Sequence, residues 1–309
     1  MVAGTVAAPR GVSRRFAVTM LVVVVLAWGF AWPVNKLILL ELSPIWAVAL
    51  RVSFGCVAMF AITAAMGRLR LPKRGDWPIV VSIALLHMVG FSVLSSIGLQ
   101  LVSTGRSVVL AYTVSLWVVP GAWLFLGERI TPRRGFGAVM GLSGLMLLFN
   151  PANFDWRDGT ALLGNVALLA SALCWGASIL HLRGHRWQSD TFDLVAWELL
   201  VASVVLLAIA SFTPWPHIAV SPHLGLLLLY AALPGTAIAY WATAVASRGL
   251  PSITMSIGLL GAPLISISTA VMAMGEPLSV ALIAAQALII GGIAVGATDP
   301  GKPPAPSKS

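Results

Sequence analysis

A set of aromatic, amide and hydroxyl side chains lies inside long apolar stretches of the sequence. Trp28, Trp32 and Asn35 follow the spacing i, i+4, i+7, which places them on one face of a helix. Such a face could bind a small amphipathic solute, because the rings bury its apolar part and the amide orients its polar part. The alternative is that the two tryptophans only pack helices together.

Similar groups occur in the middle of several other apolar stretches. His87 has a titration range that suits proton coupling, although a neutral histidine that packs between helices is the commoner case. Aromatic rings and hydroxyls in the later stretches favour small amphipathic solutes over phosphate-bearing ones. The candidate substrate-binding residues are Trp28, Trp32, Asn35, Lys36, His87, Ser95, Tyr112, Trp117, Trp175, Tyr240 and Trp241.

The elements that must position these residues come in two related sets. Residues 104–128 close as WLFLGERITP and residues 252–276 close as AVMAMGEPLS, at an offset of 148. A Trp-Gly pair at 28–29 returns at 175–176, at an offset of 147. The chain is therefore expected to consist of two related halves, with a site between them.

Composition places the chain in the membrane. It is 59% hydrophobic and 9% charged, whereas soluble domains carry about 25% charged residues. The formal charge of +9 does not indicate nucleic-acid binding, because no basic stretch lies on a soluble module. Cys56 and Cys174 lie inside apolar runs and form no metal-binding spacing, so no metal or cofactor is expected.

The apolar windows predict an all-α polytopic membrane protein with ten transmembrane helices, since about 20 apolar residues cross a bilayer and only helices satisfy the backbone there. We place the spans at 16–39, 44–66, 77–101, 106–126, 134–150, 159–182, 191–212, 223–247, 252–274 and 278–297. Helices five and ten carry Gly137-xxx-Gly141 and Gly292-xxx-Gly296, a spacing that lets helices approach closely.

Five helices per half is an odd number, so two halves of the same internal order must have opposite orientations. We predict a first five-helix repeat over 1–150, a second, inverted repeat over 151–298, and a disordered tail over 299–309 that is rich in Pro, Lys and Ser. Each half could then adopt the conformation of the other, which would open a central site to either side.

The basic residues predict that the N- and C-termini are cytoplasmic. With that orientation fifteen Lys and Arg residues face inside and only Arg106 and Arg157 face outside. The first apolar stretch is expected to be an uncleaved helix, because no small-residue cleavage site follows it. The inner set is Arg10, Arg14, Arg15, Arg68, Arg70, Lys73, Arg74, Arg129, Arg133, Arg134, Arg183, Arg186, Arg248, Lys302 and Lys308.

Three charges lie in or near the spans. Lys36 could attract a substrate carboxylate, or extend to the outer interface. Arg51 and Glu198 occupy nearly equivalent repeat positions, and charges inside a membrane usually mark function or pairing. Equivalent positions in inverted repeats lie on opposite sides of the midplane, so we expect no direct ion pair and expect both side chains to reach the interface.

The paired motifs resemble the drug/metabolite transporter superfamily, EamA type, over residues 16–297: Trp-Gly in helices one and six, and LGE-like closures after helices four and nine. The chain is most similar to the bacterial aromatic amino-acid exporter, although Pro277 stands where the first closure has Arg129. The resemblance implies a multi-pass protein of the bacterial inner membrane. It also implies a cavity between helices one, three, four, six, eight and nine, with outward transport of aromatic or apolar amino acids by alternating access.

We expect a monomer that meets only lipid and a small-molecule substrate. An enzyme would need reactive clusters of His, Asp, Glu or Ser, and none is found. A proton-coupled multidrug exporter would need a carboxylate in the cavity, where only Glu198 is a candidate. A nucleotide-sugar-type carrier would need several basic residues there, where only Lys36 is a candidate. Both carriers remain alternatives, whereas a channel is disfavoured because no selectivity loop is present.

Overall fold

The structure is a computed structural model that describes residues 13–127, 130–150, 155–214, 221–250 and 252–298. The predicted tail at 299–309 and Glu128 lie outside the described residues. The elements of the first half are α1 (Arg14–Ile38), α2 (Pro44–Ala65), η1 (Arg74–Asp76), α3 (Trp77–Ser82), η2 (Ile83–Phe91), α4 (Ser92–Leu101), α5 (Thr104–Ala111), α6 (Val114–Leu126) and α7 (Pro132–Leu148). Those of the second half are α8 (Gly159–Gly184), α9 (Thr191–Ala210), α10 (Pro222–Ala232), η3 (Leu233–Ile238), α11 (Ala239–Gly249), α12 (Ser252–Leu259), α13 (Gly261–Met274) and α14 (Val280–Ala297).

Local sequence explains where several helices begin. Ser13 Oγ accepts a hydrogen bond from the Phe16 amide (3.3 Å) and so caps α1. Asp158 Oδ1 accepts from the amides of Thr160 and Ala161 (both 3.0 Å) and caps α8. Helices α2, α7 and α10 each have a proline in the first turn, where its missing amide costs nothing.

Seven helical stretches among the described residues are long and apolar enough to cross a membrane. Two further apolar helices, Gly261–Met274 and Val280–Gly296, are shorter. The chain is therefore an all-helical, multi-pass membrane protein. The seven stretches are Arg14–Ile38, Pro44–Ala65, Arg74–Leu101, Thr104–Leu126, Gly159–Gly184, Thr191–Ala210 and Pro222–Thr243.

The two stretches predicted as single helices four and nine are each broken. The first breaks between α5 and α6, where the Thr113 hydroxyl donates to the Leu110 carbonyl (2.6 Å) and competes with the backbone ladder. The second breaks at Leu260, between α12 and α13. Pro263 follows that break, and it has no amide to donate to the carbonyl of Leu259.

The same order of elements occurs twice. In each half two long helices are followed by a helix with a π-helical segment, η2 or η3. A broken pair comes next, α5 with α6 or α12 with α13, and each second member ends in a left-handed glycine, Gly127 (φ 65°) or Gly275 (φ 66°). Only glycine adopts such a φ without strain, which explains the Gly-Glu closures.

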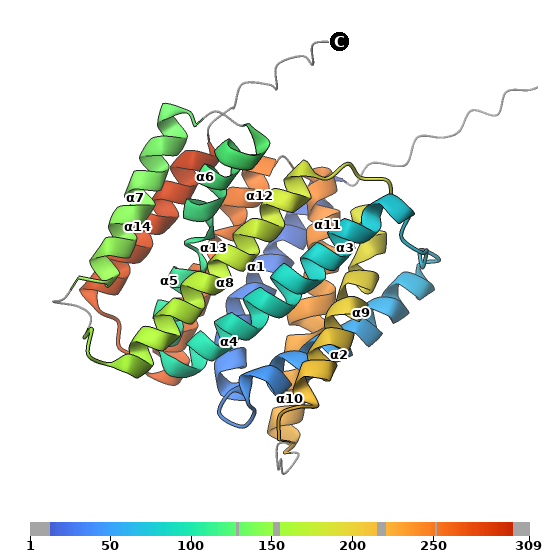
Figure 1. The fold of residues 1–309 in the computed structure, drawn as a ribbon, viewed down its shortest axis with the longest axis horizontal. Coiled ribbons are helices and arrows are strands. Elements are labelled where there is room, and N and C mark those ends of the chain that lie inside the picture. Colours follow the sequence, from blue (N-terminus) through green and yellow to red (C-terminus); the bar gives the residue numbers. More distant parts are fainter. Residues whose placement is uncertain (1–12, 128–129, 151–154, 215–220, 251, 299–309) are drawn as a thin grey trace, which may run out of the picture.

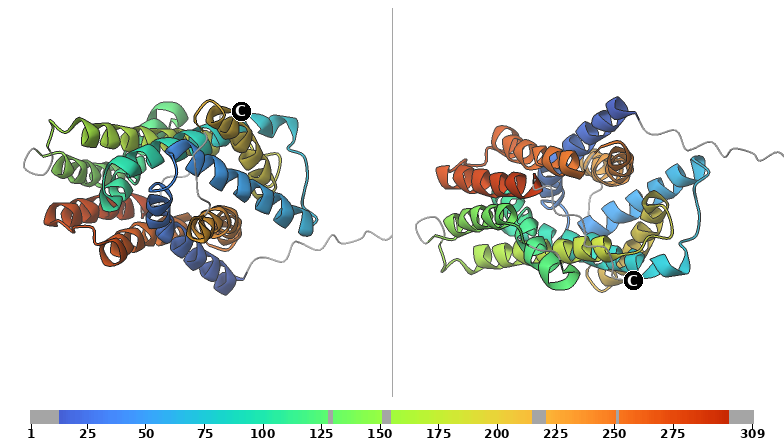
Figure 2. Two further views of the ribbon diagram at one scale, coloured as in Figure 1. Left: turned by 90° about the horizontal axis from the view of Figure 1, so that it is seen from below. Right: turned by 90° about the horizontal axis from the view of Figure 1, so that it is seen from above.

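The helices form two layers, with one pair of helices at each end (Figures 1 and 2). One layer holds α1 with α10, η3, α11, α12 and α13, and the other holds α8 with α3, η2, α4, α5 and α6. The first layer therefore combines the first helix of the first half with helices of the second half. The second layer combines α8, the first helix of the second half, with the equivalent helices of the first half. The end pairs are α2 with α9 and α7 with α14.

The α7–α14 pair is closely packed through the glycines noted in the sequence. A Cβ atom added to Gly137 would collide with the carbonyl oxygen of Gly292, and one added to Gly292 would collide with that of Gly137. Gly296 differs, because a Cβ there would meet no atom within 4 Å. The backbones of the two repeat-related helices are thus in direct contact at one crossing point.

Candidate functional site

A pocket lies between the two layers, near the end closed by α2 and α9. One layer contributes residues of α1, η3 and α11, and the other contributes residues of η2, α4, α8 and the break after α5. Both repeats therefore supply its walls. The lining residues are Trp28, Ala31, Trp32, Asn35, Arg51, Val52, His87, Met88, Phe91, Ser92, Ser95, Ser96, Leu99, Tyr112, Trp175, Leu199, Gly235, Thr236 and Tyr240.

Irregular helix geometry supplies part of this wall. The π-helical segments η2 and η3 occupy corresponding places in the two halves and carry His87, Phe91 and Thr236 to the pocket. Tyr112 lies at the break between α5 and α6. Irregular backbone at membrane depth is tolerated where it lines a cavity or lies within protein, and π-helical turns are frequent at functional sites.

Aromatic rings from four helical elements and from the break between α5 and α6 form a connected wall. His87 stacks on Trp175, with ring centroids 5.7 Å apart and planes inclined by 9°. Tyr112 meets Trp175 edge to face (5.9 Å, 86°), as does Tyr240 with His87 (6.2 Å, 81°). Trp28 extends the wall through Tyr240 (6.3 Å, 77°). The two repeat-related tryptophans thus reach the same pocket from opposite halves.

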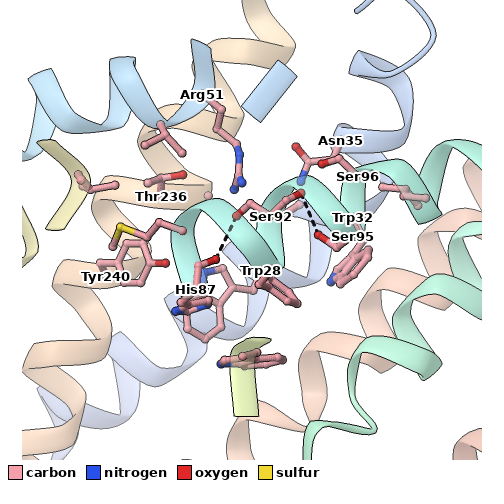
Figure 3. A pocket seen from close by; sticks show the side chains of 18 of the residues that line it. Trp28, Trp32, Asn35, Arg51, His87, Ser92, Ser95, Ser96, Thr236 and Tyr240 are labelled. Carbon is pink, nitrogen blue, oxygen red and sulfur yellow. Dashed lines mark hydrogen bonds between the residues drawn. The ribbon is translucent and has the colours of Figure 1, made fainter. Parts of the chain in front are cut away.

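Polar groups line the opposite part of the pocket (Figure 3). Ser95 Oγ donates to the Ser92 carbonyl (3.1 Å), and Ser92 Oγ contacts the His87 carbonyl at 3.5 Å. The side chains of Asn35 and Arg51 make no hydrogen bond within the described part of the chain, so the amide and the guanidinium remain available to a solute or water. The pocket therefore has an aromatic side and a hydrogen-bonding side.

Eight of the eleven candidate residues lie together in this pocket, and three lie elsewhere. Lys36 is outside the lining, because its Nζ donates to the carbonyls of Leu99 (2.6 Å) and Val102 (2.8 Å) at the end of α4. Trp117 packs near Gly176 instead. Trp241 packs against two buried clusters, one formed mainly by α2 and α9 and the other mainly by α1 and α11.

Arg51 is the charged pocket residue that the sequence interpretation misplaced. It was expected to extend to the membrane interface, but it lines the pocket from α2 and points towards the Ser92 face of α4 (Figure 3). The sequence did contain a signal for this role, because Arg51 is a cation inside an apolar span. The expectation that its side chain reaches the interface set that signal aside. Glu198 is buried, with 6% of its surface exposed, and forms no ion pair with Arg51.

The helices around the pocket also differ from the expected set. Helices two and seven were expected to stay outside it, yet α2 contributes Arg51 and Val52, and α9 contributes Leu199. Helix nine was expected to line the cavity, yet none of the described side chains of α12 and α13 belongs to the lining of this pocket. The reason is packing: Ser266 of α13 donates to the Gly29 carbonyl of α1 (2.6 Å), and α1 stands between α13 and the pocket at this level.

An all-helical membrane fold with a solute-sized pocket between two repeats defines a transporter. The EamA-like transporter family matches residues 15–150 and 162–297, and the chain belongs to this family. The two matched segments correspond to the two repeats.

Similar proteins include two transporters of Bacillus subtilis (strain 168). The uncharacterized transporter YvbV is 26% identical over 281 residues, 89% of each chain. The uncharacterized transporter YoaV is 27% identical over 184 residues, which span 60% of this chain and 63% of YoaV. A riboflavin transporter of Rhizobium johnstonii is 33% identical over 110 residues, 35% of this chain and 34% of that one. A crystal structure that covers 92% of this chain and 98% of its own superposes with a TM-score of 0.63 at 24% identity, which supports the fold.

Proposed function

We propose that this transporter carries aromatic or apolar amino acids, or similar small ring-bearing metabolites, outward across the bacterial inner membrane. The observation that carries this proposal is the aromatic wall of the pocket, in which Trp28 of the first repeat and Trp175 of the second take part. Stacked and edge-to-face rings favour a flat, apolar group between them, each such ring pair contributing about 0.5–1.5 kcal/mol beyond burial. Asn35 and the serines of α4 would orient the polar end of the solute.

Alternating access is the mechanism that the repeats favour. We infer ten spans in two inverted repeats, with boundaries near 150 and 298, since α7 and the shorter α13 and α14 complete five spans in each half. The two layers are related by the repeat, so exchanging their conformations would move the opening of the pocket from one side to the other. The protein would act as a monomer, because both halves of the pocket belong to one chain.

Other cargoes fit the pocket less well. A multidrug exporter for cations would favour an acidic lining, but no acidic side chain is among the described residues that line the pocket. A nucleotide-sugar-type carrier would favour several basic residues, and Arg51 is the one lysine or arginine among the described lining residues. Riboflavin is a second candidate, because a relative that is 33% identical over 110 residues is a riboflavin transporter, and its flat ring suits the aromatic wall.

Uptake into proteoliposomes tests the proposed cargo. We expect wild-type protein to transport tryptophan or phenylalanine, or riboflavin in the second case, in preference to drug cations. Trp175→Ala removes the ring that stacks on His87. This variant should reduce transport about 10-fold or more, because the cargo would lose one stacking partner and the burial that this ring provides. The matched control is Trp123→Ala, because that indole is 58% exposed on the outside of the bundle and should leave transport unchanged. Equal rates for both variants, with both monodisperse, would show that the aromatic wall does not bind the cargo.

The proposed orientation places both termini in the cytoplasm. In a background in which Cys56 and Cys174 are replaced by alanine, Asp155→Cys should react with an impermeant thiol reagent from outside the cell, and Trp187→Cys should not. Asp155 and Trp187 are exposed residues, and they lie in loops at opposite ends of α8. Reaction only at position 187 would reverse the orientation.

A further inference from the structure

Among the described residues that line the pocket, one side chain has a permanent charge. Arg51 enters it from α2, and no aspartate or glutamate is among its described lining residues. A guanidinium stays protonated in proteins and offers five N–H donors in a planar fork. The electrostatic character of the site is therefore set by a fixed cation.

Other arginines of the described chain show how this protein normally compensates such a charge. Arg68 pairs with Asp190 (3.0 Å) and Asp193 (2.7 Å). Arg106 donates to Asn165 Oδ1 (2.6 Å) and to the Leu148 carbonyl (3.0 Å). Arg51 has neither kind of partner within the described residues. Its donors point into the pocket instead (Figure 3).

Among the residues that the structure describes, no group near Arg51 takes the place of an anion. Tyr240 and His87 line the same pocket, and neither is a carboxylate. Glu198 is buried in α9, but it is not among the described lining residues and forms no ion pair with Arg51. A charge at membrane depth that the protein leaves uncompensated indicates a ligand that compensates it.

The polar surroundings of Arg51 favour a carboxylate as that ligand. Guanidinium and carboxylate are planar and can form two parallel hydrogen bonds. The side chains of Asn35 and Ser92 lie on the same side of the pocket (Figure 3), and their oxygens could accept a hydrogen bond from an adjacent ammonium group. The aromatic wall would then hold the ring of the same molecule.

We infer that Arg51 is the carboxylate-binding residue of the pocket and that the cargo class is ring-bearing carboxylates, aromatic amino acids among them, rather than aromatic amines or uncharged rings. This inference rests on the proposed function, because it assumes that the pocket binds the transported solute. It assigns to Arg51 the role that the sequence offered to Lys36, whose ammonium is engaged by the carbonyls of Leu99 and Val102.

The test compares four solutes that share an indole ring and differ in charge: tryptophan, indole-3-propionate, tryptophan amide and tryptamine. Binding to purified wild-type protein is measured by calorimetry, and transport by uptake into proteoliposomes. We expect the two carboxylates to bind about 10- to 100-fold more tightly than the amide and the amine, the ratio expected for hydrogen bonds to a charged group. Arg51→Gln should abolish this preference, and Arg51→Lys should keep part of it.

A matched control removes the same charge away from the pocket. Arg70→Gln alters an exposed arginine in the loop after α2, and it should keep the wild-type preference. If Arg51→Gln does not fold, the wild-type series and Arg51→Lys still decide the question. Equal wild-type binding of tryptophan and tryptamine would overturn the inference.

A fifth solute, hexanoate, separates this inference from the proposed function. If hexanoate binds in an Arg51-dependent manner and no indole compound does, the carboxylate site is supported and the aromatic cargo is wrong. If all indole compounds bind equally well, the aromatic cargo is supported and the role of Arg51 is wrong. If none of the five solutes binds, both fail.

Discussion

Gly292→Ala is expected to destabilise the folded protein by about 1–3 kcal/mol, the usual cost of forcing an extra group into a packed contact. The added methyl group would collide with the Gly137 carbonyl oxygen where α7 crosses α14. The atoms nearest to it belong to the backbone of Gly137 and Gly141, so no change of rotamer can relieve the collision. Alanine favours a helix over glycine by about 1 kcal/mol, so any loss must come from the crossing and not from helix propensity.

Gly296→Ala is the matched control, one turn further along the same helix. A Cβ at that position meets no atom within 4 Å, so this variant should be as stable as wild type or slightly more stable. Thermal unfolding of the purified proteins in detergent, followed by tryptophan fluorescence, measures both. Equal melting temperatures for the two variants would mean that the α7–α14 crossing is not as close as the structure has it.

Glu276→Ala is expected to weaken the contact between the two repeats at the end of the bundle where α4 ends and α5 begins. Glu276 lies after α13, and its Oε1 and Oε2 accept hydrogen bonds from the amides of Thr104 (2.8 Å) and Gly105 (3.1 Å). These amides begin α5 and have no partner within the helix. Losing a capping carboxylate at a helix N-terminus costs about 0.5–2 kcal/mol, and more where the amides are buried.

The expected order of melting temperature is wild type, then Glu276→Gln, then Glu276→Ala, because glutamine keeps one acceptor oxygen and loses the charge. Glu41→Gln is the control: its carboxylate lies in the loop after α1, where its closest partners are His223 at 3.6 Å and Ser221 at 3.5 Å. This control should unfold like wild type. If Glu276→Ala is as stable as the control, the Glu276 contact does not contribute to holding the two repeats together.

The Glu276 contact also bears on transport. Lys36 of α1 binds the last carbonyls of α4 at the same end of the bundle, so both connections join elements of the two layers there. In the proposed alternating access, opening the bundle at this end would require both connections to break. We therefore expect Glu276→Ala to change the transport rate as well as stability.

The sequence by itself determined the class of protein and its repeat. Apolar windows of membrane length leave helices as the way to satisfy the backbone, so an all-helical membrane fold followed directly. The Gly-Glu closures marked real chain reversals, because Gly127 and Gly275 both adopt the left-handed conformation that glycine favours. The face shared by Trp28, Trp32 and Asn35 was also readable, since helical periodicity fixes which residues of one helix point the same way.

Which faces meet was decided only by the tertiary structure. Periodicity does not say whether a given face points to lipid, to a neighbouring helix or to a pocket. Trp117, Trp175 and Trp241 are all tryptophans inside apolar stretches, yet of these three only Trp175 lines the pocket. The breaks in helices four and nine depended on a hydroxyl and a proline that a hydropathy window averages away.

The two cations show the same limit. Lys36 and Arg51 are both single charges in or near apolar spans, and of the two only Lys36 was a candidate for binding the substrate, with extension to the interface as its alternative. Packing reversed their roles: the carbonyls at the end of α4 come within reach of Lys36, whereas α2 closes one end of the pocket and turns Arg51 inwards. A long side chain can reach in several directions from one backbone position, so the positions of the neighbouring helices, and not the residue type, determine what it binds.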